Sequence, residues 1–356
     1  MLSRSYRLLA SFLIPVVLTA SPTFADRRCT DPDTGERLSY PENVLIELGG
    51  LAVNPDGTTA SYTVGDHGYT YLANGVNLVG KPRIPCAPKA NNIKCRNEWL
   101  KAEAQGFRAG SPVFCVFAME VVPIEENKPR VPCERELGDG RFLVGDGKGR
   151  PKIGENVPTA TGGTTQTYVS TTALKHLVGG GVVSVDAAKV PGIVVPRSHS
   201  GLLGSVAWVS YKGRATFALV TDIGPRFGEA SIALHQMLQY GSLQNLQPVG
   251  PIPKDQRCST SELKLKAPFQ SKPDHSEDVC RRGRTVETAT DIRAYAGIED
   301  GVTTIILPDV KPRSEGGVIQ SDLATVSLSE LANKGGYTEK KLKQMASCRL
   351  KQGEKP

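Results

Sequence analysis

The chain after residue 165 repeats one pattern, in which short runs rich in Val, Ile and Thr are each ended by Gly or Pro. The runs are TYVSTTAL (167–174), GVVSVDA (181–187), GIVVP (192–196), SVAWVSY (205–211), ATFALVTD (215–222) and TTIILP (303–308). Runs of this length and spacing are typical of a β-barrel or β-sandwich and not of alternating strands and helices. We therefore expect a mainly β protein with a few helices, built as a β-barrel or a β-sandwich.

Local signals place one hairpin and three helices within this framework. The run 205–222 is divided by Lys212-Gly213, which predicts a hairpin turn. Apolar residues recur at helical spacing after Glu229, so this residue is expected to open a buried helix that ends near Gly241. Two further short helices are expected at LSELANK (328–334) and TEKKLKQMA (338–346), in a C-terminal helical extension, 313–356.

The N-terminus indicates export. Residues 1–25 contain Arg4 and Arg7, an apolar run, and the sequence TFA before Asp26. This arrangement is typical of a secretory signal peptide cleaved before Asp26, and an uncleaved membrane anchor is the alternative. No later stretch approaches the ~20 apolar residues that a membrane span needs. We expect a secreted or periplasmic protein with no membrane contact after cleavage.

Charge and cysteine content narrow the functional classes. The formal net charge of +7 becomes +5 without Arg4 and Arg7, and the basic residues form no stripe interleaved with aromatics, so no nucleic-acid partner is expected. All eight cysteines lie in the exported part, where disulfides form. Short loops favour the bridges Cys115–Cys133 and Cys258–Cys280. Neither a CxxC pair nor histidines at zinc spacing occur, so no metal is expected.

The stretch ALVTDIGPRFGEASIAL (218–234) carries two carboxylates on either side of a Gly-Pro turn. In an extended strand, alternate residues share a face, so Asp222 would lie on the face of Thr216, Ala218 and Val220. Gly and Pro favour a chain reversal that turns Asp222 and Glu229 towards one cleft. The alternative is structural, since an acidic residue is common before a turn and in the first turn of a helix.

This stretch resembles the D-x-G-P…G-E-x-S-I-A-L block of the fungal-type chitosanases, glycoside hydrolase family 75. Further blocks that resemble the family are GTTASYTVGDHGYTYLANGV (57–76), TYVSTTAL (167–174), VDAAKVPGIVVP (185–196) and GVTTIILP (301–308). They favour a single catalytic domain over 26–312, with residues 138–165 as a Gly/Pro/Thr-rich surface loop. Two departures are a shorter loop between the carboxylates and Gly192 in place of an aromatic residue.

The resemblance implies an endo-acting, inverting hydrolase of β-1,4-linked glucosamine polymers that needs no cofactor. It places the catalytic pair at Asp222 and Glu229, and we assign Glu229 as the acid and Asp222 as the base, with the swapped order open. By analogy with other inverting polysaccharide hydrolases, the barrel is expected to be of the double-psi type. The candidate substrate-binding residues are Tyr168, Trp208, Tyr211 and Asp186. Core packing is an alternative role for the three aromatics and turn formation for Asp186.

Chitosan is a polycation, and a chain of net charge +5 offers it no long-range attraction. Two other functions therefore stay open. One is hydrolysis of another exported polysaccharide, such as peptidoglycan or a β-glucan. The other is a non-catalytic polysaccharide-binding protein with the same fold.

Overall fold

The computed structural model describes residues 26–30, 34–65, 72–80, 82–86, 89–134, 141–159, 162–243, 249, 297–323 and 326–353. The expected signal peptide and the proposed Cys258–Cys280 bridge lie outside these ranges.

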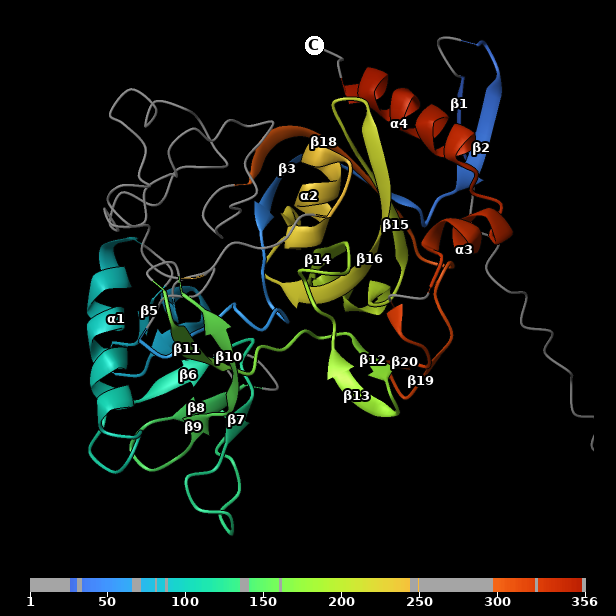
Figure 1. Cartoon of the computed structure of the whole chain (residues 1–356). Coiled ribbons are helices and arrows are strands. Elements are labelled where there is room, and N and C mark those ends of the chain that lie inside the picture. Colours follow the sequence, from blue (N-terminus) through green and yellow to red (C-terminus); the bar gives the residue numbers. More distant parts are fainter. Residues whose placement is uncertain are drawn as a thin grey trace, which may run out of the picture.

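Six strands close into a barrel (Figure 1), in the order β14–β16–β15–β18–β3–β17. Their bounds are β3 (Leu45–Val53), β14 (Gly192–Pro196), β15 (Val206–Tyr211), β16 (Arg214–Gly224), β17 (Glu229–Ala230) and β18 (Ile298–Leu307). Two of the pairings are parallel, β14 with β16 and β17 with β3, and the others are antiparallel. The mainly β architecture and the barrel are confirmed, and the double-psi assignment stays a prediction.

The hairpin β15–β16 turns where the sequence predicted it. Lys212 and Gly213 have φ angles of 46° and 80°, as a two-residue turn of type I′ requires. The strands on either side pair without interruption from Tyr211 with Arg214 to Val206 with Leu219. This end of the barrel is regular.

Helix α2 (Ile232–Tyr240) packs against β14, β15 and β16. Ser231 caps it through its hydroxyl, which accepts a hydrogen bond from the Leu234 amide at 3.1 Å, and Gly241 ends it with φ 81°. Its buried leucines join an apolar cluster to which all six barrel strands contribute. The cluster contains Leu51, Ile193, Val195, Ala207, Val209, Ala218, Val220, Ala230, Leu234, Leu238, Ile298, Val302 and Ile306.

A second apolar cluster lies between the barrel and the C-terminal segment. It joins Trp208 and Ile305 of the barrel to Leu342 and Met345, which lie on α4 (Glu339–Gly353). Helix α3 (Leu328–Lys334) contributes the buried Ala332. Both C-terminal helices were predicted, and they pack on the barrel through this second cluster.

The described residues between 72 and 151, joined by Tyr62 and Tyr168, build a lobe with a core of its own. Its centre is Trp99 on α1 (Lys89–Ala104), whose ring meets those of Phe107, Phe114 and Tyr168 edge-on at 5.1 to 6.2 Å between centroids. The disulfides Cys86–Cys95 and Cys115–Cys133 close this lobe, and the second confirms the prediction. Thus the predicted single domain contains separate hydrophobic centres.

The sequence analysis missed helix α1. Its expectation of one long loop over 138–165 is wrong, because this segment contains strands β8, β9 and β10. The lobe and its connections contain η1 (Leu72–Gly75), β4 (Val76–Leu78), β5 (Ile84–Pro85), β6 (Phe114–Val116), β7 (Val121–Val122), β8 (Phe142–Val144), β9 (Arg150–Pro151), β10 (Ile153–Pro158) and β11 (Thr164–Tyr168).

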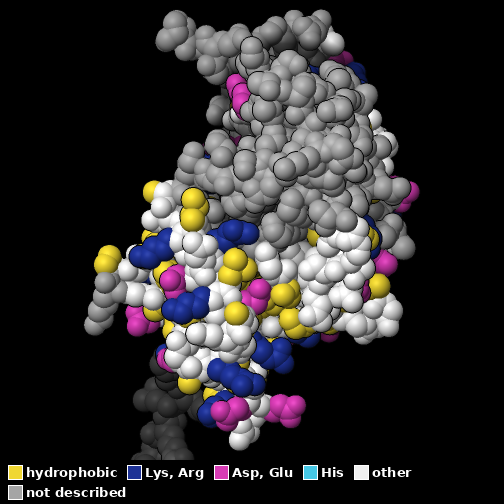
Figure 2. All heavy atoms as spheres, turned by 60° about the vertical axis from the view of Figure 1, so that its left-hand side comes forward, with side chains coloured by type: hydrophobic (Ala, Val, Ile, Leu, Met, Phe, Trp, Pro, Cys, Tyr) yellow, Lys and Arg dark blue, Asp and Glu magenta, His cyan; other side chains and the backbone are white. Residues whose placement is uncertain are grey.

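The remaining elements surround the barrel. They are β1 (Asp26–Thr30), β2 (Arg37–Pro41), β12 (Lys175–Val178), β13 (Gly181–Ser184), η3 (Arg197–Leu202), β19 (Ser314–Glu315) and β20 (Val318–Ile319). On the face drawn in Figure 2, Lys and Arg side chains lie scattered among Asp and Glu. Among the helices in the described ranges, none is long and apolar enough to cross a membrane.

Candidate active site

Strand β14 brings the two predicted carboxylates together. Val194 pairs with Asp222 of β16 on one side and with Glu229 of β17 on the other. Directly paired residues point to the same face of a sheet, and neighbouring strands lie ~4.8 Å apart, so the two Cα atoms are separated by about 10 Å. Both side chains are half-buried. The register places both side chains on one face of the sheet, and whether they face one cleft stays a prediction, since Glu229 and Asp222 line two different hollows.

Asp222 reaches this face because of an irregularity in β16. Ile193 pairs with Val220 and the next residue, Val194, pairs with Asp222, so Thr221 is an extra residue, as in a β-bulge. The bulge turns Asp222 to the face opposite Val220, which points into the barrel's apolar cluster. The expectation that Asp222 shares a face with Ala218 and Val220 is therefore wrong.

Glycines allow the chain to reverse tightly between the carboxylates. A side chain at Gly224 would lie 2.8 Å from Cγ1 of Val194 and 3.7 Å from Oε2 of Glu229. The Glu229 carboxylate thus extends back across β14 to the strand that carries Asp222. Gly228 has φ 95°, and its carbonyl accepts a hydrogen bond from the Ala52 amide at 2.7 Å. This contact anchors β17 to β3.

Glu229 lies in strand β17, three residues before the first residue of α2. The expectation that it opens the helix is wrong, since Ser231 supplies the N-cap. The structural explanation based on the first helical turn does not apply to Glu229.

Sequence analysis missed a third carboxylate at the site, Asp56, together with Asn54. Both lie in the NPDG turn that follows β3. The Asn54 amide donates from Nδ2 to Oε2 of Glu229 at 3.3 Å, while its Oδ1 accepts from the Asp56 backbone amide at 2.8 Å. Tyr62 donates its hydroxyl to Oδ1 of Asp56 at 2.7 Å. A turn directly after a barrel strand, rich in side chains that can bind substrate, was the available signal.

Burial raises the pKa of all three carboxyl groups. For Asp222 the pKa rises to about 6, although hydrogen bonds from the Ala173 and Ile223 amides, both 2.9 Å, favour the charged form. Burial, and next the charge of Asp222, hold the pKa of Asp56 well above its usual value. Burial also raises the pKa of Glu229, against the opposing effects of the Asn54 hydrogen bond and the Arg226 charge. Crowded carboxyl groups of this kind are characteristic of acid–base sites.

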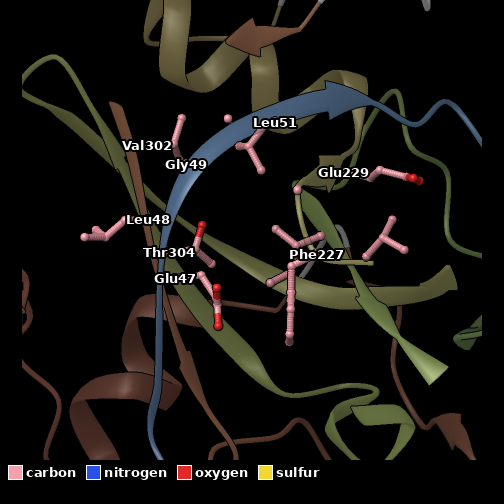
Figure 3. Close-up of a pocket in the computed structure, with 12 residues that line it drawn as sticks. Glu47, Leu48, Gly49, Leu51, Phe227, Glu229, Val302 and Thr304 are labelled. Atoms are coloured by element: carbon pink, nitrogen blue, oxygen red, sulfur yellow. The ribbon is translucent and has the colours of Figure 1, made fainter. Parts of the chain in front are cut away.

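Two hollows meet at Val194. The larger, about 220 Å³, is lined by Glu47, Gly49, Phe227, Glu229 and Thr304 among others. Figure 3 shows Phe227 projecting between Glu47 and Glu229, with the Glu229 oxygens turned away from Glu47. The smaller hollow is lined by Asn54, Asp56, Asp222 and their neighbours.

Two of the predicted substrate-binding aromatics are wrong. Tyr168 and Trp208 are each only 2% exposed. Tyr168 packs on Trp99 and donates its hydroxyl to Glu103 at 2.5 Å, in the lobe. Trp208 lies in the cluster beneath the C-terminal helices. Neither ring is accessible to a sugar.

The other two candidates have local roles. Tyr211 pairs with Arg214 at the hairpin end of β16. Arg214 lies eight residues before Asp222 on the same strand, so Tyr211 is about 26 Å from Asp222 along the strand. Asp186 accepts hydrogen bonds from Thr58 Oγ1 and the Ala188 amide at 3.1 and 2.9 Å, and it pairs with Lys189 at 3.1 Å. These contacts favour the turn role for Asp186.

Gly192, which departs from the family pattern, cannot carry an aromatic side chain in this structure. A Cβ at this position would lie 2.4 Å from Oγ1 of Thr221, the bulged residue.

Nowhere in the described ranges do three or more His, Cys, Asp or Glu side chains gather in a way that could hold a metal ion. No protein-family model matches this chain, and no curated protein matches it as a relative.

Proposed function

We propose that this protein is an exported glycoside hydrolase that cleaves β-1,4 bonds of a glucosamine polymer with inversion, through Asp222 and Glu229. The observation that carries the proposal is the register of both carboxylates with Val194, from opposite sides and on one face. Inverting enzymes hold two carboxyl groups roughly 6.5 to 9.5 Å apart, with room for a water. Flanking strands at about 10 Å between Cα atoms are compatible with that separation.

The electrostatics favour the swapped assignment of roles. An inverting enzyme needs one protonated carboxyl group to donate to the leaving oxygen and one carboxylate to activate water. Burial raises the pKa of Asp222 to about 6, closer to neutrality than that of an ordinary aspartate, and Asp56 lines the same hollow. Burial raises the pKa of Glu229, but the Asn54 hydrogen bond and the Arg226 charge oppose that rise and favour its ionised form. We therefore propose that the acid function belongs to Asp222 and the base function to Glu229.

Local charge supports a cationic substrate in spite of the net positive charge of the chain. Three half-buried carboxyl groups gather at the site, and the cations that act on them are Lys175 beside Asp222 and Arg226 beside Glu229. Burial lowers the pKa of Lys175. A partly negative cleft attracts protonated amines over the short range at which a glucosamine polymer binds.

The test is release of reducing ends from chitosan, chitin, peptidoglycan and a β-glucan by the mature protein. Asp222→Asn and Glu229→Gln are run beside it, with Asp300→Asn, an exposed acid on β18, as the control for charge. We expect cleavage of chitosan, loss in both site variants, and an α-anomer as the first product seen by NMR. If only another polymer is cleaved, that polymer is the substrate in place of chitosan. If the protein binds a polymer but releases no reducing ends, it is a binding protein and not a hydrolase.

A further inference from the structure

Asp56 comes to the site from outside the chain segment that carries the catalytic pair. We propose that Asp56 is a positioning residue that acts through Asp222: the two carboxyl groups hold one proton between them at neutral pH, and this proton is delivered to the leaving oxygen. The inference rests on the proposed function and adds the group that keeps its acid protonated.

The contacts hold the two carboxyl groups at one hollow from separate parts of the fold. Asp56 is fixed by its hydrogen bond from Tyr62, a side chain buried in the lobe core. Asp222 is fixed by the Ala173 and Ile223 amides, which both donate to its Oδ1. Both residues line the smaller hollow. Neither carboxyl group can therefore move away to relieve the repulsion between them.

The charged groups around the pair explain why one proton remains. The negative charge of Glu229 raises the pKa of both carboxyl groups, and the positive charge of Lys175 lowers the pKa of Asp222. Tyr62 and Asn54 stabilise ionised Asp56 by hydrogen bonding, but burial and the charge of Asp222 act more strongly in the opposite direction. Two carboxyl groups in this relation lose their protons in separate steps that belong to the pair. The pKa of Asp222 is about 6, and burial together with the charge of Asp222 holds the pKa of Asp56 well above its usual value, so we expect one proton to stay on the pair above pH 6.

Asn54 links this pair to the base. Its amide bonds Glu229 through Nδ2 and the Asp56 backbone through Oδ1. One short turn thus fixes the orientation of Glu229 and the position of Asp56 together.

The proton of the pair passes through Asp222 to the glycosidic oxygen as the bond from that oxygen to the anomeric carbon breaks. The oxygen of a water bonds to the anomeric carbon from the opposite side, and Glu229 takes the proton that this water loses. The pair is then doubly ionised and Glu229 is protonated, so one proton must move through solvent from Glu229 to the pair before the next turnover.

The experiment is the pH dependence of kcat/KM from pH 4 to 9 for the wild type, Asp56→Asn and the control Asp300→Asn. The wild-type rate should fall only well above pH 6, because the second proton of the pair is held more tightly. In Asp56→Asn a single proton with a pKa of about 6 remains. Activity should stay near wild type at pH 5 and fall about 10-fold per unit above pH 6, or roughly 100-fold at pH 8.

Tyr62→Phe is a matched variant that should shift the pH profile in the opposite direction to Asp56→Asn. It removes the hydrogen bond that favours ionised Asp56, so the alkaline fall should move to higher pH. A ¹³C NMR titration of the carboxyl groups in the folded protein gives a readout independent of turnover. The signal that titrates at the higher pH should be absent in Asp56→Asn.

Three outcomes would overturn the inference: a wild-type fall already near pH 6, an unchanged profile in Asp56→Asn, or an equal loss at every pH. Failure of the proposed function would look different: either the wild type would release no reducing ends, or Asp222→Asn and Glu229→Gln would retain activity.

Discussion

The molecule buries carboxylates in two regions, and the two regions differ in the groups that surround these carboxylates. In the lobe, Glu103 accepts hydrogen bonds from the Tyr168 hydroxyl at 2.5 Å and the Gly65 amide at 3.0 Å, and burial raises its pKa. Its partners are neutral. At the barrel site, like charges add to the effect of burial, since Asp222 and Glu229 raise the pKa of Asp56, and Glu229 raises the pKa of Asp222. Burial acts on Glu103 without a like charge among its causes, whereas burial and like charges together raise the pKa values of Asp56 and Asp222.

The largest expected effect separates the two regions by activity. Glu229→Gln should lower kcat on the polymer by about 10²- to 10⁴-fold, the usual contribution of a positioned acid or base. Glu103→Gln, the matched change in the lobe, should leave kcat within about twofold. Kinetics with both purified variants would contradict the comparison if the two losses were similar.

The next effect concerns the packing of the lobe. Trp99 is fully buried and lies against three aromatic rings, so Trp99→Ala should reduce the free energy of unfolding by about 3 to 5 kcal/mol. Denaturant unfolding measures this change. A loss under about 1 kcal/mol would mean that the lobe core is not built around this ring.

A smaller effect with a distinctive pH dependence is expected at the barrel site. Because the folded pKa of Asp222 is about 6 against 3.8 ordinarily, ionising it destabilises the folded state. This loss of stability is absent below about pH 4 and complete above about pH 6. Asp222→Asn, whose amide oxygen can still accept the two backbone hydrogen bonds, should be more stable than wild type at pH 8, by at most about 3 kcal/mol.

At pH 4 the two proteins should be equally stable by the same unfolding measurement. A variant less stable than wild type at pH 8 would show that Asp222 is a structural residue like Glu103.

The smallest effect tests Tyr168. Tyr168→Phe removes one hydrogen bond from a buried carboxylate and should lower stability by about 1 to 3 kcal/mol, with KM for the polymer unchanged. Isothermal unfolding and steady-state kinetics check both halves. A large rise in KM would show that Tyr168 contributes to substrate binding.

Local pattern was enough for several elements. The hairpin at Lys212-Gly213 depends on two neighbouring residues that accept positive φ. Helices α2 and α3 each start at a serine N-cap. Helix α1 was missed because its buried residues, Cys95, Trp99 and Ala102, include only one large apolar side chain, while Ile93 is 59% exposed.

The substrate-binding prediction failed for Trp208 because both faces of β15 are buried. Trp208 points to the cluster under the C-terminal helices, and its neighbours Ala207 and Val209 point into the barrel. An aromatic residue in a strand is accessible to a sugar only if one face of the sheet is open, and packing across the chain decides that.

The sequence by itself determined the mainly β architecture, the hairpin, the C-terminal helices and the segment in which Asp222 and Glu229 lie, because these depend on residues close together in the chain. Only the tertiary structure decided which face Asp222 occupies, since the bulge at Thr221 exists through pairing with β14. It also decided that Asp56 joins the site, because Asn54 bonds Glu229 across 175 positions of sequence. The protonation of the site follows from that assembly, since burial and like charges act only after these segments meet.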